Sequence, residues 1–371
     1  MSRRLLYITN GITGPGGLER TLAVRTRLLS ERYGYAIHML TLGEDGKTPF
    51  YDFPSSIRLH HVPWEGSPVA RLRGWAQGIA RVARLVQPDL TAVCDDGFKG
   101  FFVPWLLRSC KSPVIYERHV SRLIQAGGKP PTLARRAQFA AMRALGSRFD
   151  RFIVLTPANT GEWPMDNVEV IPNPIPFYPS VPSSGTQKRV IAVGKISAQK
   201  NYGALLAAWK TAHAHFPDWS LDIFGAENDG GELRRAVLAA GLEHSFRLHA
   251  PTRAIMDEYL NASICAMSSR YEGFGMMLVE AMACGVPCAA FDCPCGPGDI
   301  IRHGEDGLLV PAEDAAGLAD ALMRLMGDDA LRASMAAAAR HNIKRYAAET
   351  VVARWDALFR TLCGEGKGGR P

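Results

Sequence analysis

Short apolar runs alternate along the chain with longer stretches of helical periodicity. The runs of strand type lie at 5–9, 36–42, 90–94, 114–117 and 152–156 in the first half, and at 190–193, 220–224, 247–249 and 264–267 in the second. Amphipathic stretches such as 21–33, 203–215, 231–240 and 253–260 separate them. Strands that alternate with helices twice over predict an α/β chain of two doubly wound domains, which place ligands at the carboxyl ends of their strands.

A segment dense in Pro and Ser divides the two series. It follows 168–176 and extends to Gly185, and such a composition is typical of an interdomain linker. We therefore predict a first Rossmann-like domain at 1–175, a linker at 176–187 and a second Rossmann-like domain at 188–348. A last helix is predicted from Glu349 to Cys363, ahead of a tail rich in Gly and Lys.

Composition narrows the class of protein. Hydrophobic residues make up 47% and charged residues 21%, as in soluble globular proteins, and no apolar run reaches the roughly 20 residues that span a bilayer. The start of the chain reads as a first strand rather than a signal peptide. Eight scattered cysteines favour a reducing cytoplasm. Cys293 and Cys295 form a lone Cys-x-Cys without the second pair that a zinc site needs.

Basic residues are concentrated in the first domain. Residues 1–175 hold 23 lysines and arginines against 14 acidic residues, whereas the remainder hold 20 against 22. Such an imbalance indicates an anionic partner: a membrane face, a lipid diphosphate, a lipopolysaccharide core or nucleic acid. One predicted helix carries Arg71, Arg73, Arg81 and Arg84 among apolar residues. It is either an interfacial amphipathic helix or an ordinary surface helix with a solvated basic face.

The segment from Glu272 to Glu280 is the strongest candidate for a ligand site. Gly273 and Gly275 allow close backbone approach to a ligand, and good helix formers follow from Met276. If the helix starts near Phe274, the free N–H groups of its first turn point toward the region that Glu272 also faces. Such N–H groups favour the binding of phosphate. Two carboxylates about two turns apart can grip opposite ends of one polar ligand. The alternative is a solvated helix with two surface glutamates.

A second glycine-rich turn, Gly11–Gly17, follows the first predicted strand and opens a helix. Its glycines permit close approach to a ligand at the helix N-terminus. The turn is not the G-x-G-x-x-G of dinucleotide-binding proteins, and Glu44 and Asp45 only loosely match the acidic residue expected after the second strand.

Taken together, these segments resemble family 4 of the retaining glycosyltransferases. The Glu272–Glu280 spacing is similar to the family's E-x7-E motif, in which the first glutamate faces the donor sugar and the second binds the ribose. Residues 291–301 and 304–311 continue the likeness, with Asp299 where glutamate is usual. Residues 193–201 are similar to the element whose two cations bind the donor diphosphate, here Lys195 and Lys200, although the first is usually arginine.

The resemblance implies a GT-B fold, in which two Rossmann-like domains face a cleft and a terminal helix, here about 349–371, packs back on the first. It implies catalytic roles for Glu272, Lys195, Lys200 and His119, the last of which follows the fourth strand. Donor-binding positions are implied at Gly16, Gly17, Gly273, Phe274, Gly275, Met276 and Glu280. The Gly16–Gly17 element faces the cleft in the family, near the donor phosphates or the acceptor.

The mechanism implied is metal-independent and retaining. Two lysines can stabilise charge on a nucleotide leaving group, and the absence of any Asp-x-Asp from the sequence argues against a metal-dependent GT-A transferase. We expect no metal and no cofactor, with the nucleotide sugar as substrate. Glu272 would orient or support the sugar rather than act as a nucleophile.

The function expected is transfer of a hexose or N-acetylhexosamine from a nucleotide sugar, with UDP the commonest choice, to a lipid-linked or saccharide acceptor in bacterial cell-surface glycan synthesis. The protein would be cytoplasmic, with possible contact to the inner face of the anionic membrane and none to nucleic acid. A nucleotide-sugar epimerase or a phosphorylase on the same scaffold remains an alternative. A nicotinamide-dependent oxidoreductase and a non-enzymatic module that binds anionic surfaces also remain open.

Overall fold

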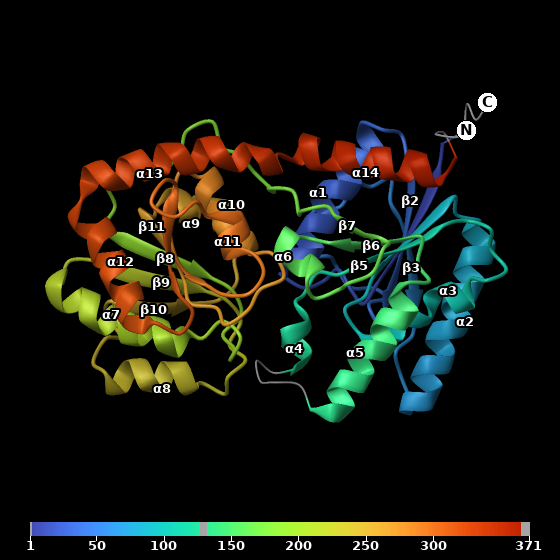
Figure 1. Cartoon of the computed structure of the whole chain (residues 1–371), viewed down its shortest axis with the longest axis horizontal. Helices are drawn as coiled ribbons and strands as arrows, with labels where there is room; N and C mark the ends of the chain where they lie inside the picture. The colour runs from blue at the N-terminus through green and yellow to red at the C-terminus, as the bar shows by residue number, and fades with distance from the viewer. Residues whose placement is uncertain (1, 127–131, 365–371) are drawn as a thin grey trace. The chain divides into compact units, whose positions relative to one another are not determined.

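The computed structural model describes residues 2–126 and 132–364, which form two α/β units (Figure 1). Unit 1 comprises the described residues of 2–120, 132–174 and 348–364, and unit 2 those of 121–126 and 175–347. In this division the segment predicted as a linker, 176–187, falls within unit 2, and one internal segment of the first half also does. Residues 121–126, which include α4 (Arg122–Ala126), are grouped by their contacts with unit 2 although they lie within the first half of the sequence.

Unit 1 is built on a seven-stranded parallel sheet with the order β3-β2-β1-β4-β5-β6-β7. Its strands are β1 (Arg4–Thr9), β2 (Ala36–Leu42), β3 (Arg58–Val62), β4 (Leu90–Cys94), β5 (Val114–Glu117), β6 (Arg151–Val154) and β7 (Val168–Val170). The five strands predicted for this half are present. The two that the pattern missed, β3 and β7, lie at the edges of the sheet, where a strand needs no continuous apolar run.

Unit 2 repeats the arrangement with a six-stranded parallel sheet in the order β10-β9-β8-β11-β12-β13. Its strands are β8 (Arg189–Val193), β9 (Ser220–Phe224), β10 (Phe246–His249), β11 (Ile264–Met267), β12 (Cys288–Asp292) and β13 (Gly307–Pro311). In each sheet the strand order reverses beside the first strand, between β1 and β4 and between β8 and β11. Loops that leave the carboxyl ends of those strands border a crevice, where such sheets bind ligands.

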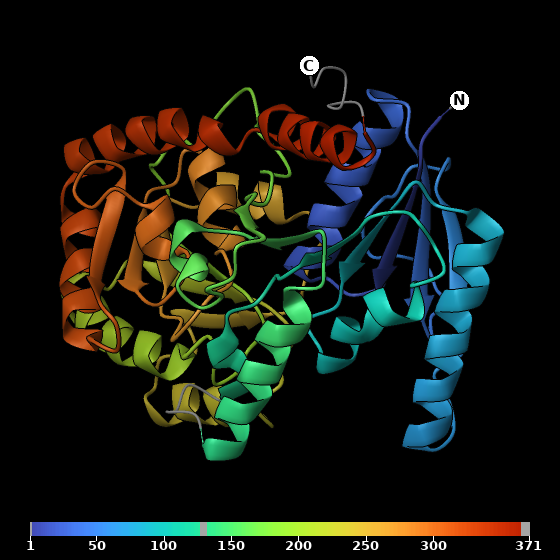
Figure 2. The ribbon, with the colours of Figure 1, turned by 45° about the vertical axis from the view of Figure 1, so that its right-hand side comes forward.

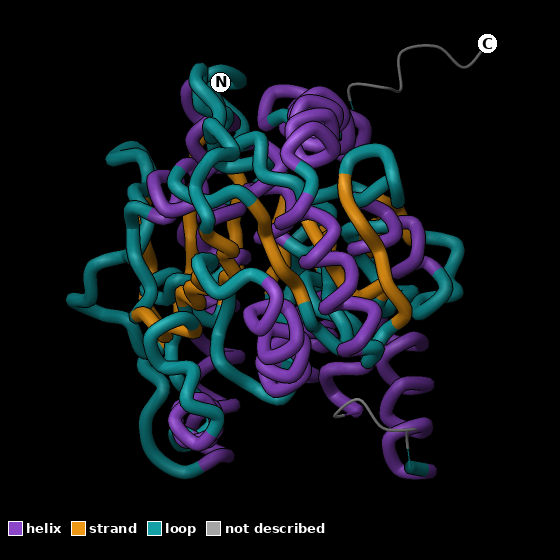
Figure 3. Tube along the Cα trace, turned by 90° about the vertical axis from the view of Figure 1, so that its left-hand side faces the viewer, coloured by secondary structure: helices purple, strands orange, loops and turns teal. Residues whose placement is uncertain are grey.

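Helices connect the parallel strands and cover the sheets (purple around orange in Figure 3). Those of unit 1 are α1 (Gly17–Glu31), α2 (Pro68–Val86), α3 (Val103–Leu106), α5 (Leu133–Gly146), α6 (Pro157–Thr160) and α14 (Ala348–Leu362). Besides α4, those of unit 2 are α7 (Tyr202–His215), α8 (Glu232–Ala239), α9 (Ile255–Leu260), α10 (Met276–Ala283), α11 (Pro297–Ile300), α12 (Ala315–Gly327) and α13 (Asp329–Asn342). In the described part of the chain, no helix combines the length and apolar character needed to cross a membrane.

The terminal helix α14 completes the core of unit 1, where it packs beside α1 (Figures 1 and 2). Trp355, which is 1% exposed, belongs to the same apolar cluster as Leu22 and Leu29 of α1. The Trp355 ring centroid also lies 4.2 Å from Cζ of the buried Arg25. In addition, the Tyr35 hydroxyl donates a hydrogen bond of 2.8 Å to Asp356. The last helix is therefore an integral part of the first unit's core.

Replacing Trp355 by alanine should destabilise unit 1 by about 3–5 kcal/mol, because it leaves a large cavity and removes a ring from a buried guanidinium. Urea unfolding followed by circular dichroism measures the loss. Trp105 in α3 is 59% exposed and provides the matched control, since Trp105→Ala makes the same change on the surface of the same unit. Equal losses in the two variants would show that α14 is not part of the core.

Candidate active site

Two loops meet at the carboxyl edge of the second sheet. One leaves β8 and spans 194–201, and the other leaves β11 and spans 268–275. They meet because β8 and β11 are neighbours at the point where the strand order reverses. The Arg270 N–H donates to the Gln199 carbonyl at 2.9 Å, and the Gln199 side-chain amide donates to the Tyr271 carbonyl at 3.1 Å. These bonds fix the loops against each other.

Lys200 and Glu272 form an ion pair between the two loops. Lys200 Nζ lies 2.6 Å from Glu272 Oε1, and the side chains are 17% and 8% exposed. Gly194 makes room for the lysine, because a Cβ at this position would lie 2.7 Å from the Lys200 Cε atom. An ammonium group has three donors, so the pair leaves Lys200 able to donate to a phosphate as well.

Lys195, the other predicted phosphate-binding cation, has a different environment. Its side chain is exposed, and the described residues provide it with no ion-pair partner. Its backbone is nevertheless fixed, since the Ser197 hydroxyl donates to the Lys195 carbonyl at 3.2 Å and the Ile196 N–H donates to the Ala226 carbonyl at 2.9 Å. The structure therefore places one cation beside Glu272 and leaves the other free to reorient.

The helix after Glu272 begins at Met276, where the run of good helix formers was predicted to start. Gly275 precedes it with a φ of 106°, a conformation that favours glycine and delays the first helical turn. The side chain of Phe274 is 3% exposed and packs edge-on against Tyr346 at 5.3 Å, so only its backbone can serve a ligand. A Cβ at Gly296 would lie 2.0 Å from the Phe274 carbonyl oxygen, which explains the glycine there.

Glu280 lies in the buried part of α10. Glu272 and Glu280 are only 6% and 4% exposed, so the alternative of two solvated surface glutamates is wrong. The Tyr259 hydroxyl donates to Glu280 Oε2 at 3.1 Å and orients the carboxylate. Burial raises the pKa of the neighbouring Cys284 to about 12, and the charge of Glu280 adds to this shift. A carboxylate retained in such an apolar helix favours a role in binding over one in stability.

The glycine-rich turn of unit 1 is fixed by acidic side chains. Glu44 accepts hydrogen bonds from the backbone N–H groups of Ile12 at 2.7 Å and Thr13 at 3.0 Å. It therefore supports the turn, and both of its carboxylate oxygens are engaged there. Gly16 caps α1 without a side chain, because a Cβ there would lie 2.4 Å from Glu19 Oε2.

Glu19 is a candidate that the sequence interpretation missed. Its carboxylate folds back over the turn, within 2.8 Å of where a Cβ of Gly14 would lie. Burial raises the pKa of Glu19 above its usual value, and the charge of Glu44 acts in the same direction. The signal available in the sequence was an acidic residue two positions after Gly17, in the first turn of a helix.

His119 follows β5 at the same edge of the first sheet, and its side chain is 5% exposed. Its ring nitrogen Nε2 lies 3.1 Å from Glu117 Oε2, and its backbone N–H donates to Asp96 Oδ1 at 2.9 Å. Glu117 in turn accepts two hydrogen bonds from Arg25, of 2.8 and 2.9 Å. Glu117 and Arg25 were missed because Glu117 ends a short apolar strand and Arg25 is one of several charges in α1, and only the tertiary structure pairs them.

Cys94, Glu117 and His119 each offer one atom to a group within 4.8 Å, which raises the question of a metal ion. The donor set does not fit one. Both carboxylate oxygens of Glu117 are engaged by the Arg25 guanidinium, whose charge would repel a cation. Burial raises the pKa of the Cys94 thiol, which disfavours the thiolate that binds metals.

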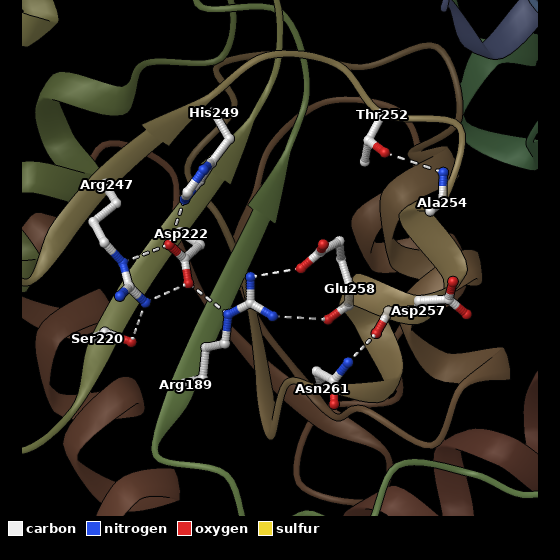
Figure 4. A network of polar contacts seen from close by, with 10 residues as sticks. All are labelled: Arg189, Ser220, Asp222, Arg247, His249, Thr252, Ala254, Asp257, Glu258 and Asn261. Carbon is white, nitrogen blue, oxygen red and sulfur yellow. Dashed lines mark hydrogen bonds and ion pairs between the residues drawn. The ribbon is translucent and has the colours of Figure 1, made fainter.

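A second ionic network crosses three neighbouring strands of the second sheet, β8, β9 and β10 (Figure 4). Asp222, with 1% of its side chain exposed, accepts from Arg189 at 2.5 Å, Arg247 at 2.7 Å and His249 at 2.6 Å. Arg189 also pairs with Glu258 at 2.7 Å. Burial acts to raise the pKa of Asp222, but the hydrogen bonds from these cations outweigh it and lower the pKa overall. His249 is thus held by a buried carboxylate at the end of β10.

Comparison with known families covers both units. Residues 178–342 match the model described as glycosyl transferases group 1, and residues 16–174 match the model described as a glycosyl transferase 4-like domain. The amylovoran biosynthesis glycosyltransferase AmsD of Erwinia amylovora is 28% identical over 375 residues, which cover 96% of this chain and 99% of AmsD. An exopolysaccharide phosphotransferase of Streptomyces coelicolor is 34% identical over 251 residues, but the match spans only 26% of that protein.

Solved structures share the fold at low sequence identity. Sucrose-phosphate synthase from Thermosynechococcus elongatus superposes with a TM-score of 0.81 at 20% identity, over 97% of this chain and 99% of that one. Anabaena HepE in complex with UDP and glucose gives 0.77 at 18% identity, over 96% and 99%. Staphylococcus aureus TarM in complex with UDP gives 0.78 at 14% identity, over 96% and 99%. These likenesses show the GT-B fold.

The ionised Glu117 should make stability depend on pH. Burial acts to raise its pKa, but Arg25 and the hydrogen bond from His119 outweigh burial and bring the pKa to about 2, against 4.5 for an ordinary glutamate. The contribution of the ionised Glu117 carboxylate to the free energy of unfolding is therefore complete above pH 4.5, and it is lost as the pH falls toward 2. We expect the stability advantage of wild type over Glu117→Gln to shrink by about 1.4 kcal/mol per pH unit below pH 4.5.

Urea unfolding at pH values from 6 down to 3 checks this expectation. Glu169→Gln is the matched control, because Glu169 pairs with Arg151 in the same sheet but its side chain is 40% exposed. That variant should differ little from wild type at every pH. A wild-type advantage over Glu117→Gln that stays constant across the range would contradict the assignment.

Proposed function

The chain belongs to the group 1 glycosyltransferases, and on this basis we propose that it transfers a hexose or N-acetylhexosamine from a UDP-sugar to a lipid-linked or saccharide acceptor in bacterial cell-surface glycan synthesis. The observation that carries the proposal is the pairing of Lys200 with Glu272 ahead of the buried Glu280 in unit 2. A UDP ligand is supported by the complexes of HepE and TarM, and the acceptor class by the name of AmsD.

Each part of a nucleotide sugar finds a chemical partner in this arrangement. A carboxylate oriented by Tyr259, as Glu280 is, can accept two hydrogen bonds from the vicinal hydroxyls of a ribose. Lys200 and the exposed Lys195 side chain can neutralise a diphosphate, with the first N–H groups of α10 assisting. Glu272 is then left beside the sugar, where a carboxylate can accept from its hydroxyl groups.

The reaction proposed is metal-independent and proceeds with retention at the anomeric carbon. As the bond between sugar and diphosphate breaks, negative charge develops on the leaving phosphate. Lys200 can stabilise that charge directly, so a divalent ion is not required for it. Glu272 supports the positive charge that develops on the sugar ring. The acceptor oxygen forms the new bond and gives its proton to the leaving phosphate.

A nucleotide that binds the native state should raise its melting temperature. We expect stabilisation by UDP and UDP-sugars in a thermal-shift panel that also contains GDP, ADP and NAD, by about 2.7 kcal/mol at a ligand concentration 100 times the Kd. Glu280→Gln should lose most of this stabilisation. Glu232→Gln, on the exposed face of α8, should keep it. Stabilisation by NAD alone, or by none of the nucleotides, would sink the proposal.

We further propose that unit 1 contacts the inner face of an anionic membrane, where a lipid-linked acceptor would lie. The buried face of α2 is formed by residues such as Trp75 and Ile79, yet the helix also exposes both apolar and basic side chains. Among the apolar ones, Val69 is 76% exposed, Leu72 49% and Leu85 72%. The basic ones, all exposed, are Arg71, Arg73, Arg81 and Arg84. This mixture suits a headgroup layer.

The membrane proposal makes a quantitative expectation for vesicle binding. Each arginine near an anionic surface contributes about 1 kcal/mol, so the double variant Arg71→Gln, Arg73→Gln should bind phosphatidylglycerol vesicles about 30-fold more weakly. Co-sedimentation at low salt measures the affinity of each protein for the vesicles. Lys210→Gln with Arg324→Gln removes the same charge from unit 2 and serves as control. Equal binding by all three proteins would refute a role for α2.

A further inference from the structure

The two ring nitrogens of His119 have different environments. Nε2 lies 3.1 Å from the Glu117 carboxylate. Nδ1 is buried, and none of the described residues gives it a hydrogen-bond partner. A buried polar atom without a hydrogen-bond partner lowers the stability of the folded state by about 1–3 kcal/mol. Its presence at the carboxyl edge of the first sheet therefore indicates a functional role.

The ionisation of Glu117 determines which nitrogen carries the proton. Arg25 holds both carboxylate oxygens through a bidentate contact, which strongly favours the charged form. An ionised carboxylate can only accept hydrogen bonds, so His119 must donate through Nε2–H. The neutral ring then has its lone pair at Nδ1. Because Nδ1 then carries a lone pair, it can accept a hydrogen bond. The hydroxyl groups of a sugar can donate such a bond.

The pair that orients the ring is itself rigid. The side chains of Arg25 and Glu117 are each 1% exposed, and Cζ of Arg25 lies 5.1 Å from the ring centroid of Tyr7 and 4.2 Å from that of Trp355. These contacts come from β1, β5 and α14, so three elements fix the guanidinium that α1 carries. The backbone of His119 is fixed separately by Asp96.

We propose that Arg25 and Glu117 are positioning residues that hold His119 as the Nε2–H tautomer, so that Nδ1 accepts a hydrogen bond from a hydroxyl of the bound saccharide. The saccharide is either the donor sugar or the acceptor, and in both cases the chemistry is that of a hydroxyl donating to a fixed imidazole. The inference rests on the proposed transferase function for its ligand, but the tautomer does not depend on that function.

The tautomer is measured directly on the full-length wild-type protein. Histidine labelled with 15N gives distinct chemical shifts for protonated and unprotonated ring nitrogens, and His119→Asn identifies the signals of His119 by their loss. At neutral pH we expect a protonated Nε2 and an unprotonated Nδ1. A protonated Nδ1 with an unprotonated Nε2 would overturn the proposal, because Glu117 would then not act on the ring.

Ligand additions to the same sample identify the hydroxyl. A shift of the Nδ1 signal with UDP-glucose or UDP-N-acetylglucosamine, but not with UDP, assigns the contact to the donor sugar. A shift that requires a saccharide acceptor assigns it to the acceptor. If none of these additions moves the Nδ1 signal while UDP still raises the melting temperature, the hydroxyl contact is wrong although the proposed function survives.

Kinetics separate positioning from stability. In Glu117→Gln the amide can point either its oxygen or its NH2 group at the ring, and we expect kcat to fall by roughly 100-fold with UDP binding unchanged, the scale typical of a misoriented catalytic group. Glu169→Gln, which lies at the same register two strands away, should leave kcat at the wild-type value. A folded Glu117→Gln with wild-type kcat would refute the positioning role.

Two replacements of His119 keep the test valid if Glu117→Gln does not fold. The amide of asparagine reaches about as far as Nδ1, and that of glutamine about as far as Nε2. His119→Asn should therefore retain more activity than His119→Gln, because it can keep an acceptor where Nδ1 was. The reverse order would contradict the role of Nδ1. Absence of transfer by the wild type would instead count against the proposed function and leave the tautomer result intact.

Discussion

The reversal of strand order beside the first strand of each parallel sheet is the constraint on which both candidate sites depend. Parallel strands deliver all their carboxyl ends to one edge of the sheet, and the connecting helices diverge to opposite faces where the order reverses. In unit 2 this brings the loops after β8 and β11 together, and with them Lys200 and Glu272. In unit 1 it brings the turn after β1 near the segment that carries His119 after β5.

Buried charges are the second common feature of the two units. Taking a carboxylate out of water is costly unless a cation or several donors compensate. Glu117 is compensated by Arg25, and Asp222 by two arginines and a histidine. Glu280 accepts a hydrogen bond from the neutral hydroxyl of Tyr259 within α10's buried surroundings. Buried carboxylates with identified partners thus occur in both units.

Much of the fold follows from local sequence pattern. All nine predicted strands are present, and the E-x7-E segment lies where a loop passes into a helix. Periodicity alone did not predict the additional strands β3, β7, β12 and β13, because they are short, polar or interrupted by motif residues. The positive φ of Gly275 directly before α10 and the close packing of Gly296 against the Phe274 carbonyl, by contrast, are visible only in the folded structure.

The side chains of the site were only partly predictable, for a related reason. Glu272 and Lys200 could be named from spacing and resemblance, but their direct pairing is a tertiary contact across 72 residues. Glu44, Glu19, Arg25 and Glu117 acquire their roles only when the first sheet is assembled. Arg25 and Glu117 are separated by 92 residues, and no local pattern relates them. Sequence therefore indicated well the segments that bring Lys200 and Glu272 together, and poorly the surroundings of His119.

The most direct test of the central claim is hydrogen–deuterium exchange of the full chain with and without UDP, resolved by mass spectrometry into peptides. If unit 2 holds the nucleotide as argued, UDP slows exchange in the peptides that cover 194–201 and 272–280. Protection confined to other regions, or none at a UDP concentration that raises the melting temperature, would contradict the account and place the nucleotide elsewhere.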